Sequence, residues 1–167
     1  MKMLVVIKMT IFIDTEIWIF AQKIPDRSNF QDTSEYDNDL DLHQKSSEFL
    51  KQKIIESEIS MTNHQLCEIF HALAFRGKKA SKTIASKYCN QLLSSKFMHW
   101  YQVFDKHVKE AVELSMKSGI HIWDYICVLP LYNDVEILYS CDEHFKHKSF
   151  KSLGPKIENP LNIWITL

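Results

Sequence analysis

Four acidic residues, far apart in the chain, stand where a parallel sheet could bring them together. Asp14 ends an apolar stretch that is typical of a buried strand, and Asp142 shortly follows another. Glu68 belongs to the second turn of a helix expected after a strand, and Asp124 opens a short helix. In open parallel sheets, ligands bind beyond the carboxyl ends of the strands. The four side chains are therefore expected to converge at one edge of the sheet.

Converging carboxylates favour a bound metal ion. Like charges at short range raise one another's pKa, and a hard cation with oxygen ligands, Mg²⁺ or Mn²⁺, neutralises them. Such ions can activate a water molecule and stabilise the leaving oxygen in phosphodiester cleavage, so no protein nucleophile is required. Each acid also has a simpler explanation. Asp142 could cap the turn that follows it, and Glu68 and Asp124 could be solvated helix residues, whereas an unpartnered Asp14 after so apolar a stretch is costly.

The charge distribution points to a polyanionic ligand. No acid lies between Glu68 and Asp105, although this stretch is rich in bases. A run of one sign suits a polyanion, and the alternative is a solvated helix face. The residues expected to contact a phosphate backbone, with salt-sensitive binding, are Arg76, Lys78, Lys79 and Lys82.

Length and composition suit one domain spanning 1–167. The four cysteines are scattered without a CxxC pair, which favours reduced thiols and a cytoplasmic location. Lys8 and Asp14 interrupt the apolar N-terminus, which falls short of the roughly 20 residues that a membrane span needs. We therefore expect no membrane association, and Met9 could equally be the true start.

Hydrophobic periodicity predicts an α/β fold. Strands are predicted at 9–14, 58–61, 97–104 and 135–139. Helices are predicted at 17–23, 43–57, 63–77, 79–95, 105–117 and 122–129. The acidic, polar segment 26–42 is predicted to be a loop insertion, and Thr62 with Gln65 is predicted to form a capping box. Alternating strands and helices imply a parallel sheet with right-handed crossovers.

Three longer segments contain the four acids. They are IFIDTEIWIFA (11–21), ISMTNHQLCEIFHAL (59–73) and HIWDYICVLPLYNDVEILYSCDEHF (121–145). In this order they resemble the PIN-domain ribonucleases, especially the VapC-type toxins of prokaryotic toxin–antitoxin pairs. The resemblance covers the chain apart from the acidic segment. It implies a three-layer α/β/α sandwich with a central, mostly parallel sheet, and Mg²⁺- or Mn²⁺-dependent endoribonuclease activity on RNA. An antitoxin partner and a homodimer are also usual in VapC-type members.

The resemblance also implies roles for individual residues. Asp14, Glu68 and Asp124 match the family's first three acids, and Asp142 matches the acid of the late T-x-D-x-F pattern. All four are expected to be catalytic and to bind the metal. Of the hydroxyl residues, Thr15 would orient the carboxylates, and Ser140 stands where a threonine is common.

Two positions depart from the family. Many relatives have asparagine where this chain has Glu16, and a small residue where it has Tyr125, which is expected to narrow the site. These departures, with the basic run, leave open a catalytically weak RNA-binding or interaction module on the same fold.

Two further alternatives remain. Asp14-Thr-Glu16 resembles the first motif of DEDD-type exonucleases, but that family also needs a late His-x4-Asp, and His121 and Asp124 are too close together. A zinc site could use one of two histidine and cysteine sets, although neither has a recognised zinc spacing. The sets are His64, Cys67 and His71, and Cys141, His144 and His147.

Overall fold

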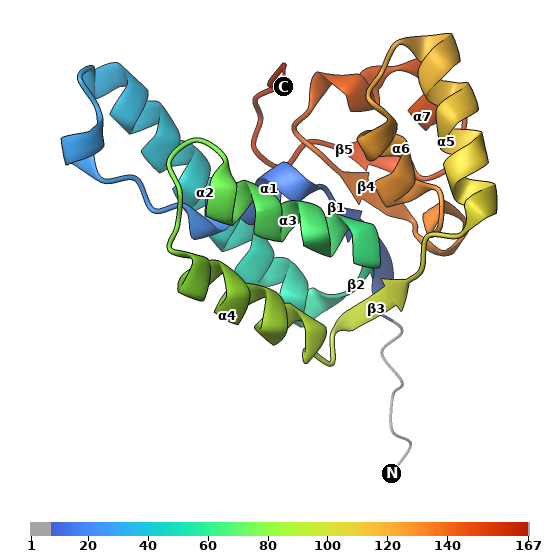
Figure 1. The fold of residues 1–167 in the computed structure, drawn as a ribbon, viewed down its shortest axis with the longest axis horizontal. Helices are drawn as coiled ribbons and strands as arrows, with labels where there is room; N and C mark the ends of the chain where they lie inside the picture. Colours follow the sequence, from blue (N-terminus) through green and yellow to red (C-terminus); the bar gives the residue numbers. More distant parts are fainter. Residues whose placement is uncertain (1–7, 167) are drawn as a thin grey trace.

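A computed structural model, which describes residues 8–166, places five strands in one sheet (Figure 1). The strands are β1 (Met9–Ile13), β2 (Ser57–Thr62), β3 (Met98–Tyr101), β4 (Ile137–Tyr139) and β5 (Lys156–Glu158). Their order is β3-β2-β1-β4-β5, and every neighbouring pair is parallel. The four predicted strands are confirmed, although the third ends at Tyr101 rather than at residue 104. The sequence did not predict β5, a three-residue edge strand too short to show periodicity.

Seven α-helices connect and cover the strands in the described part of the chain. They are α1 (Thr15–Gln22), α2 (Thr33–Glu56), α3 (Asn63–Phe75), α4 (Lys82–Leu93), α5 (Asp105–Ser118), α6 (Ile122–Val128) and α7 (Lys148–Lys151). Three short 3₁₀ helices complete the structure: η1 (Arg27–Asn29), η2 (Tyr132–Asp134) and η3 (Glu143–Lys146).

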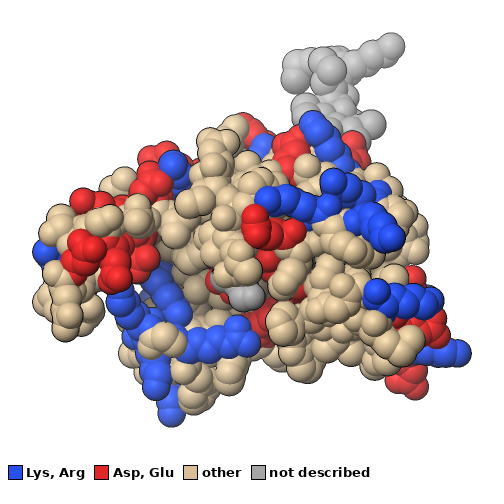
Figure 2. All heavy atoms as spheres, turned by 90° about the horizontal axis from the view of Figure 1, so that it is seen from above, with Lys and Arg blue, Asp and Glu red and all other residues tan. Residues whose placement is uncertain are grey.

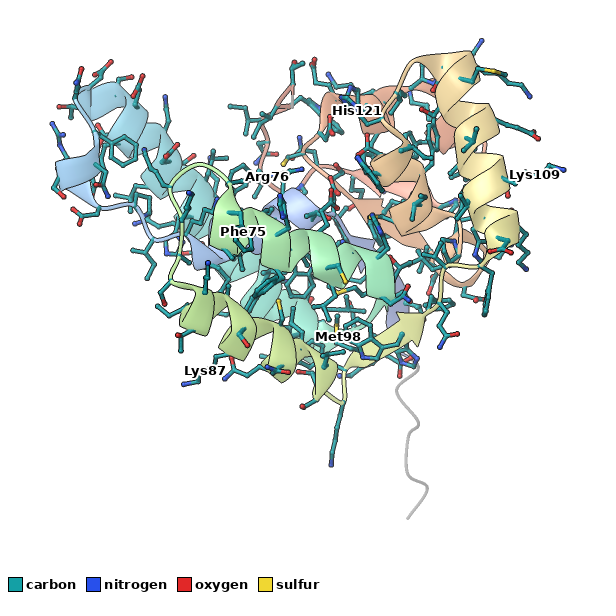
Figure 3. All side chains as sticks on the ribbon, in the orientation of Figure 1. Phe75, Arg76, Lys87, Met98, Lys109 and His121 are labelled. Carbon is teal, nitrogen blue, oxygen red and sulfur yellow. The ribbon has the colours of Figure 1, made fainter. Side chains whose placement is uncertain are left out.

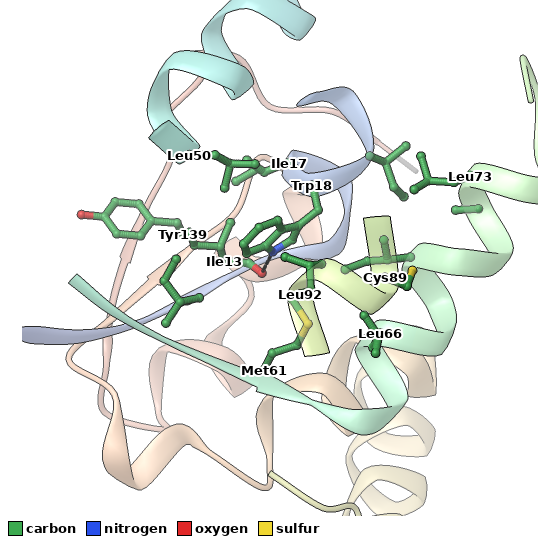
Figure 4. Close-up of a cluster of buried hydrophobic side chains, with 14 of the residues drawn as sticks. Ile13, Ile17, Trp18, Leu50, Met61, Leu66, Leu73, Cys89, Leu92 and Tyr139 are labelled. Carbon is green, nitrogen blue, oxygen red and sulfur yellow. Dashed lines mark hydrogen bonds between the residues drawn. The ribbon is translucent and has the colours of Figure 1, made fainter. Parts of the chain in front are cut away.

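The sheet separates two hydrophobic cores because side chains alternate along each strand. On one face, Ile11, Ile13 and Met61 pack with residues of α1, α2, α3 and α4. On the other face, Phe12 packs with residues of α5 and α6. Figure 4 shows the first core, where the Trp18 Nε1 donates a hydrogen bond to the Ile13 carbonyl oxygen at 3.0 Å. The predicted three-layer α/β/α fold is confirmed.

The predicted loop at 26–42 is wrong for most of its length. Helix α2 begins at Thr33, ten residues before the predicted start, and Asp32 caps it by accepting a hydrogen bond from the Ser34 N–H at 2.8 Å. Almost every side chain in the first turns is exposed, so no apolar periodicity marks them. The acidic residues that suggested a loop are favourable at a helix N-terminus, where they oppose the helix dipole.

The predicted capping box is half correct. The Thr62 hydroxyl accepts a hydrogen bond from the Gln65 N–H at 3.1 Å, as expected for the cap of α3. The buried Gln65 side chain does not return to the cap, and its Nε2 donates to the Ile13 carbonyl oxygen at 2.8 Å. This bond joins the start of α3 to the end of β1.

Among residues 8–166, no helix is long and apolar enough to cross a membrane. The alternative starts at Met1 and Met9 differ by residues 1–8, of which residues 1–7 lie outside the described residues.

Candidate metal-binding active site

Asp14 is fixed at the carboxyl end of the central strand. Its backbone N–H donates to the Tyr139 carbonyl oxygen at 2.9 Å, which joins the ends of β1 and β4. Its side chain caps α1, because Oδ1 accepts a hydrogen bond from the Thr15 N–H at 2.7 Å. These backbone hydrogen bonds to β4 and α1 fix the direction of the carboxylate, and only 8% of Asp14 is exposed to solvent.

Two buried hydroxyl groups connect the acids to one another. The Ser140 Oγ donates to Asp14 Oδ2 at 2.6 Å and accepts a hydrogen bond from the Asp142 N–H at 2.9 Å. The Thr15 Oγ1 donates to Glu68 Oε2 at 2.8 Å. The two hydroxyls therefore contact three of the four predicted acidic residues, two of them at a carboxylate oxygen.

Replacing Ser140 with alanine is expected to lower the free energy of unfolding by about 1–3 kcal/mol, the cost of leaving buried polar groups unpaired. The hydroxyl is fully buried and serves Asp14 and the Asp142 N–H together. Chemical denaturation measures the change, with Ser86→Ala at an exposed position of α4 as the control. Equal stability of Ser140→Ala and the parent protein would show that these hydrogen bonds do not hold the site.

Asp124 and Asp142 both lie close to His144, a residue that the sequence analysis did not assign to the acidic site. The His144 Nδ1 lies 3.2 Å from Asp124 Oδ2 and 3.2 Å from Asp142 Oδ2. One ligand atom from each of these three residues lies within 4.8 Å of the other two, which is a suitable arrangement for a metal ion. Asp142 also caps η3 by accepting from the His144 N–H at 2.9 Å, so capping and a place in this cluster are compatible. The sequence signal for His144 was its membership of one possible zinc set.

All four predicted acids line one pocket with a volume of about 300 Å³. The other residues around it are Thr15, Glu16, Arg76, His121, Trp123, Cys127 and His144. In Figure 3, Arg76 at the end of α3 and His121 just before α6 lie on the same upper side of the molecule. Figure 2 looks onto this side, where acidic side chains lie in a central hollow and basic side chains gather beside it.

Burial and mutual repulsion raise the pKa of several of these acids. Burial raises the pKa of Asp14 well above its usual value, although the Ser140 hydrogen bond opposes the shift. Burial and the charge of Asp142 raise the pKa of Asp124 to about 7. Burial and the charge of Glu68 raise the pKa of Glu16. The donor set therefore fits a divalent cation, whose charge removes the cost of keeping these groups ionised together.

The four predicted phosphate contacts are not equivalent. Arg76 lines the acidic pocket. Lys78 lies 3.3 Å from Asp39 of α2, in a surface ion pair. Lys82 lies over the ring of Phe75, and Lys79 is exposed. Of the four, only Arg76 is brought to the acids.

Tyr125 does not narrow the pocket. Its ring is fully buried and stacks on Phe150, and its hydroxyl donates to Ser118 Oγ at 2.8 Å. It is absent from the pocket lining, because it faces the second hydrophobic core. The expectation of a narrowed site was wrong, whereas Glu16 does add a fifth carboxylate to the pocket.

Neither possible zinc set forms a cluster among the residues that the structure describes. In the later set, Cys141 is fully buried, and His147 caps α7 through the Ser149 N–H. Only His144 of that set reaches the pocket, and its neighbours there are carboxylates.

Solved structures share this fold over most of the chain. The VapC20 toxin of Mycobacterium tuberculosis, described as cleaving the sarcin-ricin loop, matches with a TM-score of 0.60 and 16% identity, over 81% of this chain and 92% of that one. The chain has the PIN-domain fold. The predicted resemblance to PIN-domain ribonucleases is thus confirmed for the fold, which differs from that expected of a DEDD-type exonuclease.

Two complexes also contain the PIN-domain fold of this chain. VapBC2 from Rickettsia felis, bound to a DNA fragment from its promoter, matches with a TM-score of 0.56 and 14% identity, over 90% of this chain and 98% of that one. FitAB bound to a DNA fragment named IR36 matches with a TM-score of 0.54 and 12% identity, over 92% and 96%. No protein-family model matches the sequence, and a comparison with curated proteins finds no match.

Proposed function

We propose that the chain is a divalent-metal-dependent endoribonuclease that hydrolyses RNA phosphodiester bonds. The observation that supports this most is the convergence of Asp14, Glu68, Asp124 and Asp142 on one pocket of a PIN-domain fold. These acids come from four separate parts of the chain, so no local structural need places them together. The proposed cofactor is Mg²⁺ or Mn²⁺.

Asp14, Asp124 and Asp142 would hold the cation, with Glu68 beside them. When bound, the cation acts as a Lewis acid on the phosphate and lowers the pKa of water. Ser140 and Thr15 keep the carboxylate oxygens in place through the hydrogen bonds described above. The pKa of Asp124 is raised to about 7 in the absence of the cation, and a bound cation would lower it and keep the carboxylate ionised as a ligand.

Metal removal and re-addition test this proposal. RNA cleavage is expected to stop when the purified chain is treated with EDTA and to return with excess Mg²⁺ or Mn²⁺, because hard oxygen ligands bind these ions. Activity that returns with Zn²⁺ alone contradicts the carboxylate site. Persistence of full activity in EDTA contradicts any role for a metal.

RNA is the proposed substrate, and the structurally similar VapC20 is described as a toxin that cleaves the sarcin-ricin loop. Binding becomes weaker as the salt concentration rises. Arg76→Ala is expected to make the plot of log binding constant against log salt concentration less steep by about 0.7–1, the change for one lost phosphate contact. Lys96→Ala is the matched control, since Lys96 is exposed and precedes β3, away from the carboxyl ends of the strands. Equal slopes for the two variants would place the phosphate contacts elsewhere.

We also propose an antitoxin partner, because a chain with the same fold occurs in the VapBC2 complex bound to promoter DNA. On this basis the chain acts in the cytoplasm as the toxin of a toxin–antitoxin pair.

We propose that the chain forms a homodimer through the exposed face of α5. Four apolar side chains spaced four residues apart are exposed there, and on a helix this spacing forms one stripe. They are Phe104 (56%), Val108 (40%), Val112 (50%) and Met116 (76%). Val112→Glu is expected to convert a dimer to a monomer in light scattering, whereas Glu113→Gln beside the stripe preserves it. A monomeric parent protein would contradict the dimer.

A further inference from the structure

Trp123 is an exposed aromatic residue in the lining of the acidic pocket. It is the second residue of α6, directly before Asp124, and half of it (50%) is open to solvent. The other three tryptophans are less exposed: Trp18 is buried, and Trp100 and Trp164 are partly buried. The exposed indole offers a flat aromatic surface beside the pocket.

The ring of His64 stacks on the indole of Trp123. The His64 ring from the first turn of α3 stacks on Trp123, with centroids 5.2 Å apart and planes 10° apart. Partial burial lowers the pKa of His64, although the charge of Glu68 opposes the shift. A neutral, flat ring therefore packs against the indole. Because the two rings belong to different helices, the stack fixes the plane of Trp123 relative to the acids.

A nucleobase is the flat group best suited to this surface. Bases stack on aromatic side chains through their π faces, whatever their sequence, whereas paired bases in a duplex are already stacked on one another. The phosphate of the same strand carries negative charge and belongs with the cation site at the neighbouring Asp124. A nucleotide next to the cleaved bond would thus find separate places for its phosphate and its base.

We propose that Trp123, held in position by His64, stacks an unpaired base of the RNA substrate beside the acidic pocket. This inference rests on the proposed ribonuclease function and adds a base-binding subsite to it. It gives Trp123 a role in substrate binding, while the carboxylates keep the chemistry.

Binding without cleavage isolates the base contact. The Asp14→Asn protein, with Mn²⁺ present, is titrated with a fluorescein-labelled single-stranded oligoribonucleotide and with a matching strand that lacks its bases. Adding Trp123→Ala is expected to weaken binding of the intact strand roughly 5- to 150-fold, the range for loss of one stacked base. Trp123→Phe is expected to retain most of the affinity. Ile55→Ala, at an exposed apolar site on α2, is expected to have no effect.

The base-free strand separates stacking from phosphate attraction. It is expected to bind equally to the proteins with and without Trp123, because it offers no π face. The stacking proposal is overturned if the Asp14→Asn protein binds the two strands equally, or if Trp123→Ala leaves its affinity for the intact strand unchanged. Either result would favour a protein partner as the ligand of the exposed indole. If the wild-type chain still cleaves RNA in that case, the ribonuclease function stands. Absence of both cleavage and binding means that the proposed function has failed.

Discussion

Asp14→Asn is expected to reduce RNA cleavage by about a thousandfold or more. A catalytic metal contributes several kcal/mol to transition-state stabilisation, and each 1.36 kcal/mol corresponds to a tenfold change in rate. Asparagine keeps the size of the side chain and an oxygen that can cap α1, so the fold should survive. Steady-state cleavage of a labelled RNA measures the loss, with Glu110→Gln on α5 as a control outside the pocket.

The same substitution is expected to raise the melting temperature of the metal-free protein. Burial raises the pKa of Asp14, so ionising this group at neutral pH costs folding stability, and asparagine cannot ionise. Opposite effects on activity and stability are typical of a residue kept for function. Cleavage that is equal in Asp14→Asn and in the parent would instead favour a non-catalytic RNA-binding module.

The metal-free protein is expected to lose stability as the pH rises from about 4 to about 7. The pKa of Asp124 is raised in the folded protein from 3.8 to about 7, so the unfolded chain releases this proton at lower pH than the folded one. The stability from this group is therefore fully present below the unfolded pKa and is lost as the pH rises through the folded pKa. Asp14 and Glu16, whose pKa values are also raised, act in the same direction.

Mn²⁺ should reverse this loss. At a concentration of about 100 times its dissociation constant, a ligand stabilises the folded state by about 2.7 kcal/mol, or roughly 5–10 °C in a protein of this size. The gain is expected to be larger at pH 7.5 than at pH 5, because protonated carboxylates bind the ion weakly. Thermal scans at the two pH values, with and without Mn²⁺, measure it. A gain that is independent of pH would contradict binding at the carboxylates.

The sequence was sufficient to predict that Asp14 and Asp142 converge, because the topology of a parallel sheet brings the ends of its strands to one edge. Asp14 and Asp142 follow neighbouring strands, so their convergence followed once β1 and β4 were recognised. Glu68 and Asp124 lie on helices, where a solvated acid was an equally simple explanation, so the family resemblance was needed to favour a place in the site. Their place in the lining agrees with that prediction, while their catalytic role stays a proposal.

Other features could not be predicted because they depend on contacts distant in the sequence. His144 joins Asp124 only through the fold, across twenty residues of chain. Lys78 is drawn to Asp39 because α2 begins earlier than its exposed, acidic start suggested. The Gln65 side chain bonds the end of β1 rather than its own cap, a choice that local spacing does not reveal.

The position of a bound Mn²⁺ in crystals of the chain tests the central claim most directly. Anomalous scattering locates the ion without prior assumptions about its ligands. We predict a peak in the acidic pocket within coordination distance of carboxylate oxygens, with Asp14, Asp124 and Asp142 as its neighbours. A pocket without a peak at saturating Mn²⁺, or an ion held instead by His64, Cys67 and His71, would contradict the account.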